Sequence, residues 1–461
     1  MHHVPPPRPD TPAAARTHVS LFVYFACIVS SAGEFIRSFD INLMSGAILS
    51  MRHEFHMGPY EEGFAMGSAI LGCLIGSLIA GPVSARYGRK RALVICAVLY
   101  AISTWGTVFP STLWQFNLAR IIGGIGIGFA SVVCPVYIAE IAPAASRGRL
   151  IMLVQFSMVF GLTTAAITTW AMTVYGLSWR WMMASMAVPV VLFLVGLFWV
   201  PESPRWLLVR QRRDESLRVL TRLAGAEDAA NEIREIEDGL RDETGSYRDL
   251  LKPGLRRPLA IAVVLAVLSQ MVGVTTLMYY APTLFQKTGL DAADALSRLL
   301  ILNAWNILCT LMAYLLVDSL GRRPLLIVGT SGLAAGLALM GGAFYFGLSG
   351  LMVLLVFFIC IGAYVLSVAP LTWVVVAEIF PSRVRGQAVS IATAALWLTV
   401  YVVTQFFPPA VTWFEREYGS AAGIFWGFSC IAIAGVLFVW SSIPETKGRT
   451  LEEISATWRA S

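Results

Sequence analysis

The stretch EIAPAASRG at residues 140–148 recurs as EIFPSRVRG at residues 378–386. Both copies hold a glutamate, a proline, an arginine and a glycine at the same spacing. Two further short charged motifs, which we call marks, are repeated: GRK at 88–90 recurs as GRR at 321–323, and PES at 201–203 recurs as PET at 444–446. Long apolar runs separate the marks in both halves. The second half of the chain therefore repeats the plan of the first.

The composition places most of the chain in lipid. Of the 461 residues, 57% are hydrophobic and 13% are charged, whereas a soluble domain has about 45–50% apolar and about 25% charged residues. A membrane-spanning helix needs roughly 20 mostly apolar residues. Twelve such helices are expected near residues 19–48, 61–84, 92–109, 113–138, 149–175, 179–200, 259–284, 297–318, 324–346, 351–376, 386–411 and 421–443. The pattern predicts an all-α membrane protein with twelve transmembrane helices in two six-helix halves.

Basic residues gather in alternate loops of this plan. Clusters lie at 86–91, 147–149, 322–323 and 383–385, whereas the loops near 109–113 and 347–351 carry none. Because positive charge favours the cytoplasmic side of a membrane, both termini and the long polar middle segment are expected in the cytoplasm. The net charge of +6 therefore reflects orientation in a membrane and does not indicate nucleic-acid binding.

The spans and polar segments divide the chain into five parts. We expect a disordered cytoplasmic tail at 1–18, a six-helix half at 19–200, cytoplasmic linker helices at 201–258, a second six-helix half at 259–443 and a cytoplasmic tail at 444–461. Pro282 and Pro370 are expected where helices break or kink, because proline removes a backbone donor.

Five motifs carry a resemblance to a known family. PESPRWL at 201–207 and PETKGRTLEEI at 444–454 follow the sixth and twelfth spans, RIIGGIGIG at 120–128 lies in the fourth, and PVYIAEIAP at 135–143 and AEIFP at 377–381 end the fourth and tenth. In this order they resemble motifs of the sugar porter family of the major facilitator superfamily. The resemblance implies the major facilitator fold and secondary transport of a small polar solute, favouring a sugar carried with a proton.

Similarity to bacterial proton-coupled sugar symporters also implies a bacterial inner membrane, a monomer, and no partner besides solute, proton and lipid. The sequence has no nucleophile elbow, phosphate-binding loop or metal-spaced His/Cys cluster, so no enzyme, cofactor or metal site is expected. Two alternatives remain open: a proton-coupled symporter of organic acids or sugar acids, and a nutrient sensor built on a transporter fold.

The repeated marks supply matched charges at the ends of several helices. The resemblance implies that ion pairs among them hold the halves together while the cavity opens outward, and that inward opening breaks them. The alternative is that the basic residues only fix the orientation in the membrane. The expected gate residues are Arg89, Glu140, Arg147, Glu202, Arg322, Glu378, Arg385 and Glu445.

Asp40 and Arg120 lie inside predicted spans. An ionisable residue at that depth is costly and indicates function. The resemblance implies that Asp40 carries the proton and that Arg120 is its partner, so that an ion pair competes with protonation. A static ion pair is the alternative. The family has a further acidic residue in the sixth span, where this chain has Met186.

Glu34 and Arg37 precede Asp40 at spacings of three, which places the three on neighbouring faces of one helix. They could form a charge ladder that neutralises itself. Alternatively, Arg37 faces the central cavity, where the resembling symporters carry an aromatic residue. A guanidinium there would suit an anionic solute such as a sugar acid.

Solutes of such transporters bind near the middle of the membrane, between the halves. A polyol needs amide and hydroxyl partners and an aromatic ring over its apolar face. Interhelical hydrogen bonding or core packing is the alternative role of each such residue. By position in the family, and with Arg37 added, the expected solute site consists of Gln155, Ser269, Gln270, Thr275, Tyr279, Asn306, Trp373 and Trp397.

Overall fold

The computed structural model describes residues 20–143, 146–225, 229–230, 232–234, 236–237, 247–252, 254–348, 350–380 and 382–443. Within these ranges, twelve spans are long and apolar enough to cross a membrane, and the predicted all-helical architecture of two six-helix halves is confirmed. The two terminal tails predicted at 1–18 and 444–461 lie outside the described residues. Large apolar side chains such as Phe160, Phe198 and Trp440 are exposed, as expected for a surface in contact with lipid.

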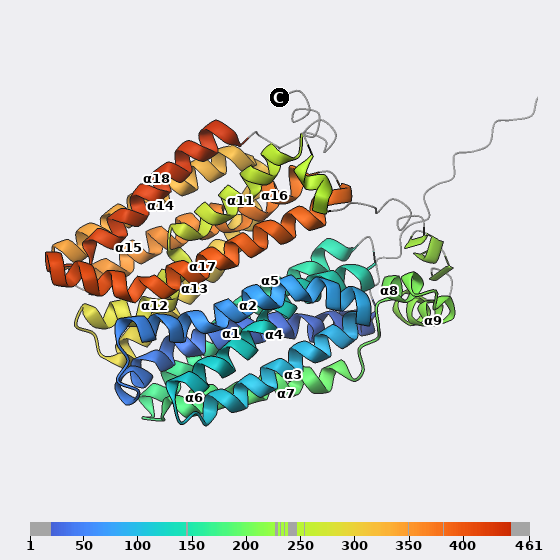
Figure 1. Cartoon of the computed structure of the whole chain (residues 1–461), viewed down its shortest axis with the longest axis horizontal. Helices are drawn as coiled ribbons and strands as arrows, with labels where there is room; N and C mark the ends of the chain where they lie inside the picture. The colour runs from blue at the N-terminus through green and yellow to red at the C-terminus, as the bar shows by residue number, and fades with distance from the viewer. Residues whose placement is uncertain are drawn as a thin grey trace, which may run out of the picture.

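The N-terminal half forms the lower bundle in Figure 1. It contains α1 (Leu21–Glu54), α2 (Pro59–Tyr87), α3 (Arg89–Val108), α4 (Leu113–Ile141), α5 (Arg147–Val174), α6 (Trp179–Ser185) and α7 (Ala187–Leu197), with α6 and α7 sharing one span. Helices α2 and α4 pack backbone against backbone, because Gly72 contacts the carbonyl of Ile121 and Gly124 contacts the carbonyl of Ala69. A Cβ at either glycine would clash, so the small residues permit this close packing in lipid.

The C-terminal half forms the upper bundle in Figure 1. Its spans are α11 (Arg256–Met271) with α12 (Val274–Lys287), α13 (Ala292–Leu320), α14 (Arg322–Tyr345), α15 (Gly350–Ala363) with the π-helical turn η3 (Tyr364–Val368) and α16 (Ala369–Glu378), α17 (Ser382–Tyr418) and α18 (Ala422–Ser442).

Two spans of this half are interrupted. Pro370 lies in the first turn of α16, which begins at Ala369 directly after η3, and the span is interrupted there as expected. The other break lies at Gly273, whose φ of +75° favours glycine, whereas Pro282 lies inside α12. The helix is not broken at Pro282, which lies inside α12, because the break falls at the left-handed residue Gly273 between α11 and α12.

Short helices join the two halves, as predicted: α8 (Pro204–Val209), α9 (Arg213–Ala224) and the 3-10 turn η2 (Tyr247–Leu251). Helix α9 lies against the start of α1, where the guanidinium of Arg222 stacks 3.9 Å from the ring centroid of Phe22. The hydroxyl of Ser216 donates to the carbonyl of Pro204 and ties α9 to α8. These helices lie at the end of the bundle that carries Arg89 and Arg322, which we call the basic end.

The two halves contact one another at the opposite end of the bundle. Gly63 of α2 lies against the backbone of Gln405 in α17, and the side-chain amide of Gln405 donates to the carbonyl of Tyr60 at 3.1 Å. Deeper in the bundle, the hydroxyl of Ser45 in α1 donates to the carbonyl of Tyr279 in α12. In Figure 1 the ribbons of the halves converge near α12 and diverge towards α8 and α9. The bundle is therefore closed at the end away from the basic loops.

Candidate functional site

The first buried ion pair joins α1 to α4. Nη1 of Arg120 lies 2.5 Å from Oδ1 and from Oδ2 of Asp40, and the two residues are 2% and 5% exposed. Nε of Arg120 has no hydrogen-bond partner in the described structure. The structure thus brings together the two charges that the sequence placed in separate spans. Burying such a pair is favourable only while both partners stay together, because removing one leaves an uncompensated charge.

The second buried ion pair lies within α1. Nε of Arg37 is 2.6 Å from Oε2 of Glu34, and Glu34 is 3% exposed. Nη2 of Arg37 donates to the thioether sulfur of Met158 in α5, which is a weak acceptor. The pair forms only part of the ladder considered above, because Asp40 pairs with Arg120 and not with Arg37. Arg37 also lines the cavity described next.

A cavity of about 230 Å³ lies between the halves. Helices α1 and α5 of the N-terminal half and α12, α13, α15, η3 and α16 of the C-terminal half enclose it. It has room for a small solute, since one water takes roughly 30 Å³ of the liquid. The polar side chains that line it are Arg37, Ser38, Gln155, Thr275, Tyr279, Asn306, Thr310 and Tyr364.

Hydrogen bonds order the C-terminal wall of this cavity. The amide of Gln270 donates to the hydroxyl of Tyr364 at 2.9 Å and accepts from the hydroxyl of Thr275 at 2.7 Å. Gln270 therefore lies behind the wall and fixes two groups that face the cavity. Asn306 accepts from the hydroxyl of Thr310, one turn further along α13, at its backbone carbonyl (2.8 Å) and its side-chain oxygen (3.3 Å).

Sequence reasoning did not find Thr310 and Tyr364. Thr310 could have been found, because a residue four positions after Asn306 shares its helix face. Tyr364 lies in the π-helical turn η3. This turn changes which face of the tenth span the following residues occupy, and the apolar sequence around Tyr364 does not indicate it.

Three residues expected in the solute site lie elsewhere in this conformation. Ser269 is buried beside α14 and α18, and its hydroxyl donates to the carbonyl of Ala266. Successive residues of a helix point about 100° apart, and here Gln270 points towards Thr275 and Tyr364 while Ser269 points towards α14 and α18. Trp397 lines a small neighbouring pocket together with Arg120 and Tyr279. Trp373 lies on α16, is 36% exposed and is not among the residues that line the cavity.

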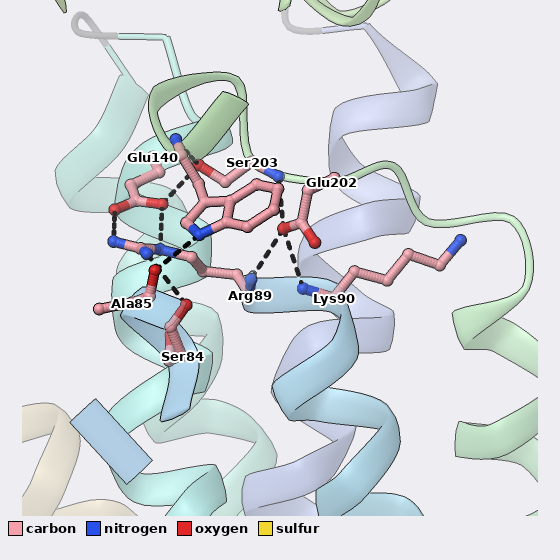
Figure 2. A network of polar contacts seen from close by, with 8 residues as sticks. Ser84, Ala85, Arg89, Lys90, Glu140, Glu202 and Ser203 are labelled. Carbon is pink, nitrogen blue, oxygen red and sulfur yellow. Dashed lines mark hydrogen bonds and ion pairs between the residues drawn. The ribbon is translucent and has the colours of Figure 1, made fainter. Parts of the chain in front are cut away.

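At the basic end, the N-terminal half holds a compact polar cluster around Arg89 (Figure 2). Nε and Nη2 of Arg89 each lie 2.8 Å from a carboxylate oxygen of Glu140, and the hydroxyl of Ser203 donates to the same carboxylate at 2.5 Å. Glu202 accepts from the backbone N–H groups of Arg89 and Lys90 at 2.8 and 3.0 Å. Glu202 thus caps the first turn of α3, where the helix dipole favours a negative charge.

The repeated cluster of the C-terminal half places Nη2 of Arg322 3.2 Å from Oε1 of Glu378. Arg385 donates to the carbonyl of Phe380 at 3.3 Å. The ion pairs Arg89–Glu140 and Arg322–Glu378 each join residues of the same half. The side chain of Arg147, and Glu445 as a whole, lie outside the described residues.

Known proteins resemble the chain over nearly its whole length. A family model described as "Sugar (and other) transporter" matches residues 26–458. The arabinose-proton symporter of Bacillus subtilis is 35% identical over 459 residues, covering 98% of each chain. The D-xylose-proton symporter of Escherichia coli is 34% identical over 478 residues, covering 95% of this chain and 96% of that protein.

Solved structures of the xylose transporter show the same fold. Its inward-open form from E. coli aligns with a TM-score of 0.81 at 32% identity, covering 95% of this chain and 100% of that one. The proton:xylose symporter bound to 6-bromo-6-deoxy-D-glucose aligns with a TM-score of 0.76 at 33% identity, covering 96% and 100%. Members of this family are transporters and not enzymes. The chain belongs to the sugar porter family of the major facilitator superfamily.

Proposed function

We propose that this protein moves a sugar or sugar-like solute across a bacterial inner membrane, in symport with a proton, by alternating access. Two features that occur together support the proposal. One is the buried Asp40–Arg120 ion pair in the N-terminal half, and the other is the cavity between the halves, which hydroxyl and amide groups line. The relatives named above as arabinose-proton and xylose-proton symporters support both the solute class and the coupling ion.

The cavity would bind the solute through neutral hydrogen bonds. Gln155 from one half and Thr275 and Asn306 from the other provide donors and acceptors, and Tyr279 provides an aromatic ring. A site that hydrogen-bonds hydroxyls rejects ligands that lack them, because its buried polar groups would stay unpaired. Gln270 would act by holding Thr275 and Tyr364 in place. Ser269, Trp373 and Trp397 remain candidates for contacts made in another conformation.

Asp40 would carry the proton. In this structure Nη1 of Arg120 lies 2.5 Å from the carboxylate and is its ion-pair partner. Both residues belong to the N-terminal half, so a shift of α1 against α4 that accompanies the transport cycle would have to separate them. An unpaired carboxylate in a low-dielectric interior is costly, so protonation then becomes favourable. Proton binding and the movement of the halves would then be coupled through one ion pair.

The basic end would face the cytoplasm together with both termini, following the distribution of positive charge. The conformation would then be inward-facing, because the halves contact one another at the far end. The TM-score of 0.81 with the inward-open xylose transporter is consistent with this conformation. The eight gate residues would form pairs across the halves when the cavity opens outward. A monomer in the bilayer suffices for this cycle.

A second candidate solute class is favoured by one observation. Arg37 lines the cavity, and a guanidinium can bind a carboxylate through two parallel hydrogen bonds. An organic acid or a sugar acid would use it, whereas a neutral pentose would not need it.

Uptake into proteoliposomes with an imposed pH gradient tests the proposal. Sugars, sugar acids and simple carboxylates should be compared as solutes. A solute of one of these classes should accumulate only while the gradient lasts. Accumulation that persists without any gradient of protons, or that follows sodium instead, would contradict proton symport.

A further inference from the structure

The two ion pairs of α1 differ in their surroundings. Asp40 and Arg120 are sealed between α1 and α4, and both are at most 5% exposed. The Glu34–Arg37 pair is buried on the side of Glu34 only, because Arg37 reaches the cavity with a side chain that is 14% exposed. A solute in the cavity can therefore touch Arg37 directly, while Glu34 lies behind it.

Glu34 depends on Arg37 for its charge balance. Oε2 accepts from Arg37, and Oε1 is buried with no hydrogen-bond partner in the described structure. The thiols and the phenol close enough to interact with Glu34 from other helices are Cys96 and Tyr100 of α3, Cys134 of α4 and Cys73 of α2. Helices α5 and α7 contribute no titratable residue between 150 and 174 or between 187 and 197.

The neutral neighbours of Glu34 have partners of their own. The hydroxyl of Tyr100 donates to the carbonyl of Gly33 at 3.2 Å, and the thiol of Cys96 to the carbonyl of Gly126 at 3.2 Å. Neither donates to Glu34. Loss of Arg37 would therefore leave a buried carboxylate without a cation or a hydrogen-bond donor, which is a costly state that protonation relieves.

Arg37 is in turn poorly satisfied. Its five N–H donors meet one carboxylate oxygen and one thioether sulfur in the described structure, and the sulfur is a weak acceptor. A carboxylate that enters the cavity could offer two oxygens to the fork of the guanidinium, which is the stronger geometry. The remaining polar wall, with Gln155, Thr275 and Asn306, suits the hydroxyls of a sugar.

We propose that this cavity binds a sugar acid, and that Glu34 is a second proton-carrying carboxylate, which becomes protonated when the solute binds. The carboxylate of the sugar acid replaces Glu34 on Arg37. Glu34 then binds a proton from the side to which the cavity opens, so that charge in the interior is conserved. On release, the solute anion leaves Arg37, Glu34 gives up its proton to that side and the original pair forms again. The inference rests on the proposed function and adds one proton per solute to that of Asp40.

The first experiment identifies the solute class. Proteoliposomes of the full chain, with an acidic exterior, should receive labelled D-glucuronate, D-glucose or D-xylose. Glucuronate should accumulate, and it should compete at roughly tenfold lower concentration than either neutral sugar, the effect of one charge-assisted contact. Accumulation of neutral sugars without uptake of, or competition by, glucuronate would overturn the inference and leave proton-coupled sugar transport standing.

The second experiment counts protons. Proton flux per glucuronate, measured with a pH-sensitive dye inside the vesicles, should fall by one in Glu34→Gln while uptake continues. Glu34→Asp should restore the ratio, since it restores the carboxylate. Because Glu34→Gln also removes the competitor for Arg37, glucuronate should bind at least as tightly. An unchanged proton ratio in Glu34→Gln would make Glu34 a fixed counter-ion and overturn the inference.

The third experiment tests whether Arg37 recognises the charge of the solute, as distinct from the general effect of removing a cation from α1. Arg37→Met should weaken glucuronate binding by roughly tenfold to a hundredfold and affect glucose much less. Arg52→Gln is the matched control, because Arg52 lies on the same helix outside the cavity, 3.8 Å from Glu62. Equal losses in Arg37→Met and Arg52→Gln would contradict a role for Arg37 in binding. If no solute accumulates under a pH gradient, the proposed function fails as well.

Discussion

The interiors of the two halves differ more than their ends. Both halves keep a glutamate, an arginine and a glycine at the basic end, and both form an Arg–Glu pair there. Inside the membrane, the N-terminal spans carry Glu34, Arg37, Asp40 and Arg120, whereas the C-terminal spans carry no charged residue at 258–286, 299–317, 324–377 or 386–414. The two halves thus share the charges of the basic end and not those of the interior.

This difference indicates a division of work between the halves. An ion pair in a low-dielectric interior responds strongly to the loss of one partner, so the N-terminal half suits the proton-dependent step. Neutral hydrogen bonds contribute about 1 kcal/mol each, so the C-terminal wall of Gln270, Thr275, Asn306 and Tyr364 suits graded recognition of a solute. Substitutions in the two interiors should accordingly have effects of different kinds.

The largest effect is expected from Asp40→Asn. The amide cannot bind and release a proton, so accumulation of a neutral sugar driven by a pH gradient should be abolished, and the proton flux per glucuronate should fall by one. Exchange of labelled for unlabelled solute across the membrane needs no net proton movement and should remain measurable. Normal accumulation by Asp40→Asn would show that the proton is carried elsewhere.

A smaller and different effect is expected from Gln270→Ala in the other half. It leaves the hydroxyls of Thr275 and Tyr364 without their shared partner, so the affinity for solute should fall roughly tenfold to a hundredfold. The number of protons carried per solute should not change. Ser269→Ala is the matched control, since this neighbouring side chain bonds only to Ala266 in the described structure. A changed proton ratio in Gln270→Ala would remove the proposed division between the halves.

Substitutions at the basic ends of the two halves should have effects of the same kind but of different size. Glu140 accepts two bonds from Arg89 and one from Ser203, so Glu140→Ala should cost about 2–3 kcal/mol of stability, the range for bonds to a charged group. It should also shift the protein towards the inward-facing state and reduce active uptake. Thermal unfolding in detergent and the distance between probes on the basic ends of α3 and α17 measure the two effects.

Glu378→Ala is the comparison for that variant. Glu378 meets Arg322 at 3.2 Å and is more exposed, at 26% of its side chain against 9% for Glu140. Solvent screens an exposed pair more than a buried one, so the loss of stability should be smaller. A larger loss in Glu378→Ala would show that the C-terminal cluster is the stronger of the two.

The sequence predicted the fold well because the pattern that decides it is long and repeated. Twelve apolar runs and three repeated charged marks are visible without contacts, and each intramembrane charge stands out against its neighbours. The depth of Asp40 and Arg120 marked both as functional candidates, and the resemblance to the sugar porter family implied that they are partners.

The rest depended on geometry that residue identities do not show. Ser269 and Gln270 are equally polar neighbours, and only the rotation of α11 decides that Gln270 supports the cavity and Ser269 does not. Tyr364 reaches the cavity through a π-helical turn, and the break at Gly273 replaced the one expected at Pro282. In each case a small change in helical register moved a side chain to another face.

The smallest effect is expected where the C-terminal interior holds a neutral contact away from the cavity. The hydroxyls of Thr276 in α12 and Thr404 in α17 lie 3.0 Å apart, and both residues are buried. Thr404→Val replaces the hydroxyl with a methyl group of similar volume and leaves the hydroxyl of Thr276 unpaired. It should cost about 1 kcal/mol of stability and leave the number of protons carried per solute unchanged. Thermal unfolding and the proton ratio together test this expectation. A loss of coupling in Thr404→Val would mean that neutral contacts in the C-terminal half also take part in the proton-dependent step, and the contrast between the two interiors would fail.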